Sequence, residues 1–113
     1  MKNLALVAVG EYTNDFITSI ETIEKFNRVF DTVYVLTDNV EKLQNYTSNT
    51  KLTYFFTFYN KDTFNYFDKL YFSLNLVLNT QKDTVYCDIR MINSLYDYNL
   101  NNNFEGIIYP REW

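Results

Sequence analysis

The stretch T-V-Y-C-D-I-R-M-I, residues Thr84–Ile92, decides how this chain is interpreted. It opens with a β-branched and apolar run, Val85–Cys87, that is typical of a buried strand. Asp88 follows where this strand should end, and Arg90 comes two residues later. Ligands of open α/β sheets bind in the crevice beyond the carboxyl ends of the strands, so the two charges are candidates for a binding site. The alternative, that Asp88 only caps or solvates a strand end, stays open.

Outward from this stretch, runs of strand length alternate with segments of helical spacing. Strands are expected at Leu4–Val9, Thr32–Thr37, Leu52–Phe58, Thr84–Asp88 and Gly106–Tyr109. Helices are expected at about residues 14–28 and about 63–79, and a short polar helix is expected to follow Asp38-Asn39 and to end at Tyr46. The alternation predicts one α/β domain over residues 1–113, with a Rossmann-like, mostly parallel sheet, flanking helices and right-handed crossovers. The most uniformly apolar runs, Leu4–Val9 and Thr84–Asp88, are expected to be adjacent central strands, and Leu52–Phe58 is expected nearer an edge.

The helix expected at about residues 63–79 is apolar on most of its sides. We expect Asp62 or Thr63 to cap it, as we expect Thr13 or Asn14 to cap the first helix. Its apolar residues recur at spacings of three and four, at Phe64, Phe67, Tyr71, Leu74 and Leu78. This is more apolar surface than one sheet face needs, and large apolar patches rarely persist on monomers. The pattern predicts a homo-oligomer, most simply a two-fold dimer, that uses this helix or the Tyr96–Trp113 tail.

The composition excludes several classes of function. The net charge is −4, which argues against nucleic acid as a partner. The chain has no histidine, which removes Ser-His-Asp and Cys-His nucleophiles and the commonest zinc ligand. Its single cysteine, Cys87, is expected to be an inert core residue, and two glycines allow neither a G-x-G-x-x-G turn nor a P-loop. Because no signal peptide or membrane-length apolar run is present, we expect a cytoplasmic protein without a membrane partner.

Four short motifs together resemble a known family. They are V-A-V-G-E-Y at Val7–Tyr12, V-Y-V-L-T-D at Val33–Asp38, F-D-K-L at Phe67–Leu70 and V-Y-C-D-I-R at Val85–Arg90. Their order and spacing resemble the nucleotide-sugar half of GT-A glycosyltransferases. The resemblance is greatest to glycosyltransferase family six, which contains the ABO blood-group transferases and smaller bacterial and phage relatives. It covers roughly residues 4–92 and implies a truncated GT-A type of α/β fold.

The resemblance also implies a ligand and a reaction. The ligand is a nucleotide sugar, a UDP-hexose, and the reaction is transfer of the sugar to a hydroxyl with retained configuration. The residues implied for the nucleotide are Val7, Ala8, Val9, Tyr12 and Lys69, with the backbone of Val7–Val9 reading the base edge and Tyr12 packing on the base. Asp88 and Arg90 are implied for the diphosphate and the sugar. No catalytic residue is assigned.

The fourth motif departs from the family pattern, because Asp88-Ile89-Arg90 stands where the family has Asp-x-Asp. Paired carboxylates would hold Mn²⁺ or Mg²⁺ against the diphosphate, whereas one carboxylate and a guanidinium form a poor divalent site. The sequence therefore predicts no metal cofactor, and Arg90 would contact the diphosphate directly. The alternative is that Arg90 pairs with Asp88 or with another nearby acid.

The family's acceptor-binding half would follow the fourth motif, and here only a short tail remains. Glu105 and Glu112 are the carboxylates of that tail that could replace the family's downstream glutamate. A second hypothesis follows: a catalytically inactive GT-A remnant that acts as a nucleotide-binding or oligomeric interaction module.

Overall fold

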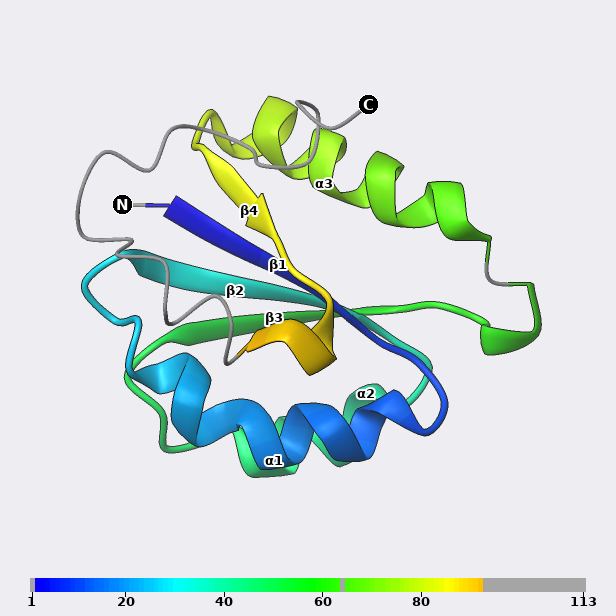
Figure 1. Ribbon diagram of the computed structural model, residues 1–113, viewed down its shortest axis with the longest axis horizontal. Coiled ribbons are helices and arrows are strands. Elements are labelled where there is room, and N and C mark those ends of the chain that lie inside the picture. Colours follow the sequence, from blue (N-terminus) through cyan, green and yellow to red (C-terminus); the bar gives the residue numbers. More distant parts are fainter. Residues whose placement is uncertain (1, 64, 93–113) are drawn as a thin grey trace.

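The computed structural model describes residues 2–63 and 65–92. Within them, four parallel strands form one sheet in the order β3-β2-β1-β4 (Figure 1). The strands are β1 (Lys2–Ala8), β2 (Phe30–Thr37), β3 (Thr53–Phe58) and β4 (Thr84–Tyr86). The helices are α1 (Tyr12–Glu24), α2 (Val40–Tyr46) and α3 (Tyr66–Thr80), with short 3-10 helices η1 (Lys61–Thr63) and η2 (Ile89–Met91). The predicted Rossmann-like α/β class with a parallel sheet is confirmed.

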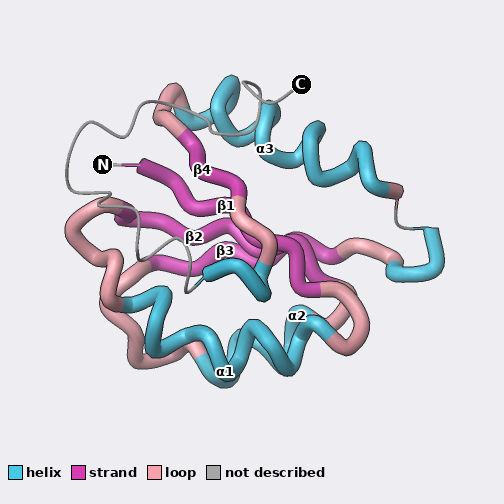
Figure 2. The backbone as a smooth tube through the Cα atoms, viewed as in Figure 1, coloured by secondary structure: helices cyan, strands magenta, loops and turns pink. Residues whose placement is uncertain are grey.

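Helices cover both faces of the sheet. Figure 2 shows α1 and α2 beneath the strands and α3 above them. On the α1 side, Leu4, Leu6 and Phe16 belong to the larger core cluster, and on the α3 side Ala5 and Val7 belong to a smaller one. Because β1 lies between β2 and β4 and under helices on both faces, nearly all of its residues are buried, which explains its continuous apolar run.

The sheet order corrects one expectation about the strands. β1 and β4 are adjacent, as predicted, and β3 lies at an edge, as predicted. β4 is not central, however: in the part of the chain that the structure describes it forms the other edge of the sheet. Its apolar character comes from the two helical layers, because Val85 enters the cluster on the α1 side and Tyr86 the cluster on the α3 side.

Both predicted helix starts were wrong by a few residues. α1 begins at Tyr12 with Glu11 as its N-cap, and the Thr13 hydroxyl donates to the Gly10 carbonyl instead of capping the helix. η1 occupies residues 61–63, so α3 begins later, with Asn65 as its N-cap. Asn65 and Asp68 form a reciprocal capping box, which satisfies two backbone N–H groups of the first turn.

The apolar stripe predicted on α3 lies mainly on its solvent side. Phe67, Tyr71 and Leu78 are 61%, 65% and 68% exposed, while Phe72 and Leu76 pack on the sheet. The buried cluster under α3 is small, so a narrow strip of the helix is enough to cover it. The expectations for Phe64, the Gly106–Tyr109 strand, the Tyr96–Trp113 interface, Glu105 and Glu112 fall outside the described residues. None of the helices among residues 2–63 and 65–92 has the length and apolar character that a membrane span requires.

Candidate functional site

A pocket of about 240 Å³ opens at the carboxyl ends of β1 and β4. Its lining residues are Val7, Tyr12, Lys69, Asp88, Ile89 and Arg90. They come from β1, α1, α3 and the segment that follows β4, so four separated parts of the chain build it. This is the edge of a parallel α/β sheet at which ligands usually bind.

The turn between β1 and α1 positions Tyr12 at this pocket. Gly10 adopts a positive φ of 65°, a conformation that side-chain-bearing residues rarely take. The Gly10 N–H donates to Oδ1 of Asp38, at 2.9 Å, and Asp38 directly follows β2. A Cβ at Gly10 would have no atom within 4 Å, so there is space for a side chain. The positive φ is therefore the reason that glycine is favoured at this position. The turn is thereby tied to the neighbouring strand, and α1 begins two residues later.

Asp88 is held by two donors on one oxygen. Lys69 Nζ lies 3.1 Å from Asp88 Oδ1, and the Tyr86 hydroxyl donates to the same oxygen at 2.8 Å. The Lys69 side chain is 19% exposed, whereas that of Asp88 is 58% exposed. Lys69 thus reaches from α3 to the end of β4, and the carboxylate that it meets still faces solvent.

Arg90 contacts Asp15 of α1 and Glu11, the N-cap of α1, and not Asp88. Its Nε donates to Asp15 Oδ2 at 3.3 Å, and its Nη2 lies 3.9 Å from Glu11 Oε1. Its guanidinium carbon lies 4.6 Å from the centre of the Tyr12 ring, within the range of a cation–π contact. The hydrogen bond that Arg90 donates to Asp15, with the charges around it, raises the pKa of Arg90, which stays protonated. The sequence left open that Arg90 pairs with a nearby acid, and in the structure Asp15 and Glu11 are those acids.

The structure brings together most of the residues that the motifs selected. Val7, Tyr12, Lys69, Asp88 and Arg90 line the one pocket. The Ala8 side chain is fully buried in the core on the α1 side, and Val9 packs against the smaller cluster, so neither side chain lines it. A role for these two residues would be limited to their backbone.

Sequence reasoning missed several residues of this region. Tyr86 holds Asp88 from two positions earlier, a spacing that strand alternation would have revealed. Glu11 and Asp15 are four residues apart and contact the same guanidinium, which the i,i+4 spacing of a helix allows. That signal depends on a helix that begins at Tyr12, and the predicted start was Asn14.

The site does not fit the divalent ion that an Asp-x-Asp motif would hold. Among the described residues, no three His, Cys, Asp or Glu side chains gather as metal ligands. Asp88, the carboxylate that lines the pocket, already accepts from Lys69 and Tyr86. Cys87 offers no nucleophile either, because burial raises the pKa of its thiol to about 12 and keeps it protonated.

Comparison with models of known protein families, with curated proteins and with solved structures finds no significant match for this chain.

Proposed function

We propose that this pocket binds a nucleotide sugar of the UDP-hexose class. The chain would then act as a small glycosyltransferase-like protein that transfers the sugar to a hydroxyl acceptor with retained configuration. One observation carries the proposal: five residues from three motifs, distant in sequence, line one pocket at the ligand-binding edge of the sheet. The ligand class itself comes from the resemblance to glycosyltransferase family six.

The charges of the pocket suit a diphosphate without a metal ion. Lys69 and Arg90 place two cations at its wall, and a guanidinium can bind phosphate oxygens in a bidentate manner. The Arg90 side chain is 60% exposed, and exposed ion pairs contribute only about 0–1 kcal/mol, so its bonds to Asp15 and Glu11 are readily exchanged for a phosphate. The same two cations would stabilise the diphosphate as it leaves in the transfer step.

The size of the pocket limits which part of the ligand it encloses. A volume of about 240 Å³ lies below the roughly 300–1,000 Å³ of typical small-molecule sites. We therefore expect it to enclose the diphosphate and part of the sugar, with Asp88 accepting from a sugar or ribose hydroxyl. The base would extend over the Tyr12 ring, which is 39% exposed. In this arrangement the aromatic face supplies the contact that a deeper pocket would otherwise provide.

The second candidate function is nucleotide binding without transfer. It is favoured by the state of Asp88, since the carboxylate in the pocket is engaged by both Lys69 and Tyr86. Among the lining residues, no other side chain is a carboxylate, thiol or imidazole that could act on an acceptor hydroxyl. Binding and transfer therefore have to be measured separately.

Isothermal titration with UDP, UDP-glucose and UDP-galactose tests the binding, first with EDTA and then with Mn²⁺. We expect binding that changes little between the two conditions. Arg90→Gln should weaken it by about 10- to 100-fold, the loss of a charge-assisted hydrogen bond of about 1.5–3 kcal/mol. The matched control is Lys42→Gln, which removes an exposed cation of α2 that bonds Asn14 and does not line the pocket; its affinity should be unchanged.

Three outcomes separate the parts of the proposal. No binding of any of the three nucleotides at millimolar concentration contradicts the nucleotide site. Binding that EDTA abolishes and Mn²⁺ restores contradicts the metal-independent reading of Asp88 and Arg90. Binding without release of UDP in the presence of a panel of sugar acceptors favours the module without transfer.

A further inference from the structure

The outer edge of β3 is unusual for a natural sheet. Among residues 2–63 and 65–92, no strand pairs with β3 on the side away from β2. Its sequence, T-Y-F-F-T-F, has no charge, proline or glycine, and its pairing with β2 shows no bulge. Edge strands normally carry at least one of these features, because an unprotected edge pairs with other chains.

The direction of the free backbone groups follows from one hydrogen bond. In a parallel pair, successive residues direct their N–H and C=O groups alternately to the two sides of the strand. The Tyr59 N–H donates to the Thr37 carbonyl of β2, at 2.8 Å, so Tyr54, Phe56 and Phe58 direct theirs outward. The Leu52 N–H points outward by the same alternation, and there it bonds the Glu24 carboxylate, at 3.3 Å. The open part of the edge therefore begins at Tyr54.

We propose that β3 pairs antiparallel with β3 of a second copy, across a two-fold axis at Phe56. A two-fold axis perpendicular to the sheet relates identical edges in this way and gives a closed dimer. Phe56 then lies opposite its own equivalent, and Tyr54 lies opposite Phe58 of the other copy. This register pairs all the outward N–H and C=O groups from Tyr54 to Phe58 and joins the two sheets into one. The inference does not depend on what the pocket binds.

The side chains of β3 fit the same register. Residues directly opposite in an antiparallel pair share a face of the sheet. Tyr54 and Phe56 stack with ring centres 6.3 Å apart, and Phe58, 67% exposed, would continue this row onto the second copy's Tyr54. On the other face Phe55, 52% exposed and stacked on Tyr34, would lie opposite Thr57. Pairing thus covers both exposed phenylalanines of the strand.

A second copy is the occupant that the uncharged and self-complementary edge of β3 favours. The chain has a net charge of −4, so two copies repel each other over much of their surfaces. The six residues of β3 are uncharged, and two copies can meet along them without like charges on the paired strands. The outward backbone groups are also self-complementary, because each outward N–H of β3 would donate to an outward carbonyl on β3 of the other copy.

Size-exclusion chromatography with light scattering at tens of micromolar tests the proposal. We expect a dimer for the unmodified chain and a monomer for Phe58→Pro, which removes an outward N–H and leaves the bonds between β2 and β3 in place. Phe58→Lys should also be monomeric. The matched control is Leu78→Lys on α3, because Leu78 is 68% exposed and Phe58 67%; it should remain a dimer.

A cysteine pair tests the register independently of whether the Phe58 variants fold. Phe55 and Thr57 of the two copies would be directly opposite, about 4.5–5.5 Å apart at Cα, a separation that a disulfide spans. The double variant Phe55→Cys/Thr57→Cys should form a covalent dimer on mild oxidation, and each single variant should form much less. A monomeric unmodified chain, a dimer that folded Phe58→Pro retains, or a double variant that does not cross-link overturns the proposal. A monomeric chain is also the result expected if a segment of another protein occupies this edge.

Discussion

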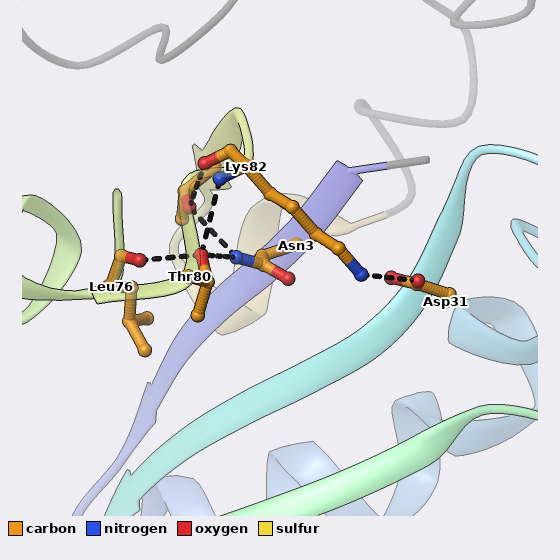
Figure 3. A network of polar contacts seen from close by, with 6 residues as sticks. Asn3, Asp31, Leu76, Thr80 and Lys82 are labelled. Carbon is orange, nitrogen blue, oxygen red and sulfur yellow. Dashed lines mark hydrogen bonds and ion pairs between the residues drawn. The ribbon is translucent and has the colours of Figure 1, made fainter. Parts of the chain in front are cut away.

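The two ends of the sheet each carry a lysine–aspartate pair, and the pairs stand in different surroundings. At the carboxyl end, Lys69 and Asp88 are 3.1 Å apart and line an open pocket. At the amino end, Lys82 and Asp31 are 2.7 Å apart and lie beside a buried network around Asn3 (Figure 3). The kind of ion pair therefore does not identify a site. The two ends differ in the open space beside the pair and in the burial of the neighbouring residues.

The amino-end network ties three parts of the fold together. Asn3 is 1% exposed, and its Nδ2 donates to Thr80 Oγ1 at 2.8 Å and to Thr84 Oγ1 at 3.2 Å. The Thr80 hydroxyl in turn donates to the Leu76 carbonyl (Figure 3). β1 is thus joined to the last turn of α3 and to the start of β4. In the described residues Asn3 Oδ1 has no hydrogen-bond partner, so little polar compensation is available for any added charge.

The largest expected difference between the two ends is in the loss of unfolding free energy caused by Asn3→Asp at the amino end and by Asp88→Asn at the carboxyl end. Asn3→Asp buries a carboxylate without a cation, and we expect a loss of unfolding free energy of at least about 3 kcal/mol at pH 7. Burial raises the pKa of that new carboxyl above its unfolded value of about 3.9, so the loss should shrink as the pH falls towards 4 and below. Urea denaturation at several pH values measures it.

The reverse exchange at the carboxyl end is the control for this prediction. Asp88 is 58% exposed, so Asp88→Asn should change the unfolding free energy by less than about 1 kcal/mol. Equal losses in the two variants would contradict the distinction between the two ends.

Replacing each lysine by methionine sharpens the comparison at intermediate size. Lys69→Met should weaken UDP binding by about tenfold or more, because a charge-assisted contact with a phosphate contributes about 1.5–3 kcal/mol. It should alter stability little, because the Asp88 carboxylate that loses its cation is 58% exposed to solvent. Lys82→Met should leave UDP affinity unchanged and lower stability by up to about 1 kcal/mol, because Asp31 Oδ2 would lose its cation and Asp31 Oδ1 has no hydrogen-bond partner among the described residues. Calorimetric titration and urea denaturation of both variants make the measurement. If both variants lost binding to the same extent, the charge of the whole protein and not the pocket would determine affinity.

The smallest expected effect is on acid stability. The hydrogen bond from Lys82 is the main cause that lowers the pKa of Asp31 below its usual value. A depressed pKa in the folded state stabilises the protein above about pH 4 and loses that contribution as the pH falls through the folded value. Because both side chains of the Lys82–Asp31 pair are more than a third exposed, we expect this contribution to the unfolding free energy to be less than about 1 kcal/mol.

Thermal unfolding at pH 7 and pH 3 checks the prediction. Asp31→Asn should narrow the difference between the two midpoints, and Lys82→Met should narrow it to a similar extent. A difference that neither variant changes would assign the acid sensitivity to other carboxylates.

The sequence pattern predicted the fold class and the place of Asp88 for a common physical reason. Alternating strand and helix periods imply a parallel sheet, and a parallel sheet brings the carboxyl ends of its strands to one edge. The strand pattern could therefore place Asp88 at that edge, whereas Tyr12 and Lys69 were selected through the resemblance to glycosyltransferase family six. The partners of Arg90 could not be predicted, because Glu11 and Asp15 meet it only if α1 begins at Tyr12, and the cap of α1 forms no side-chain hydrogen bond that a pattern could reveal.

The inward face of α3 could not be predicted for a different reason. When a helix is apolar on most sides, its periodicity does not say which side is buried. The sheet makes that choice, and it selects Phe72 and Leu76 over Phe67, Tyr71 and Leu78. The edge position of β4 could not be predicted for a similar reason. A strand that is buried by helices on both faces has the same continuous apolar sequence as a strand that is buried between two other strands.

The position of β1 between β2 and β4 has a consequence for how the chain folds. The hydrogen bond between Asn3 and Thr84 joins residues 81 positions apart, so the sheet closes only after most of the described chain has been brought together. Pairings of such long range slow folding, because the entropy of loop closure is lost before the contact is gained. Until β4 docks, one edge of β1 stays open. In an intermediate that contains β1, β2, β3, α1 and α2, we therefore expect the amide protons of Ala5 and Val7 to exchange with solvent faster than those of β2. We therefore expect the docking of β4, the shortest of the four strands, to be the step that completes the sheet.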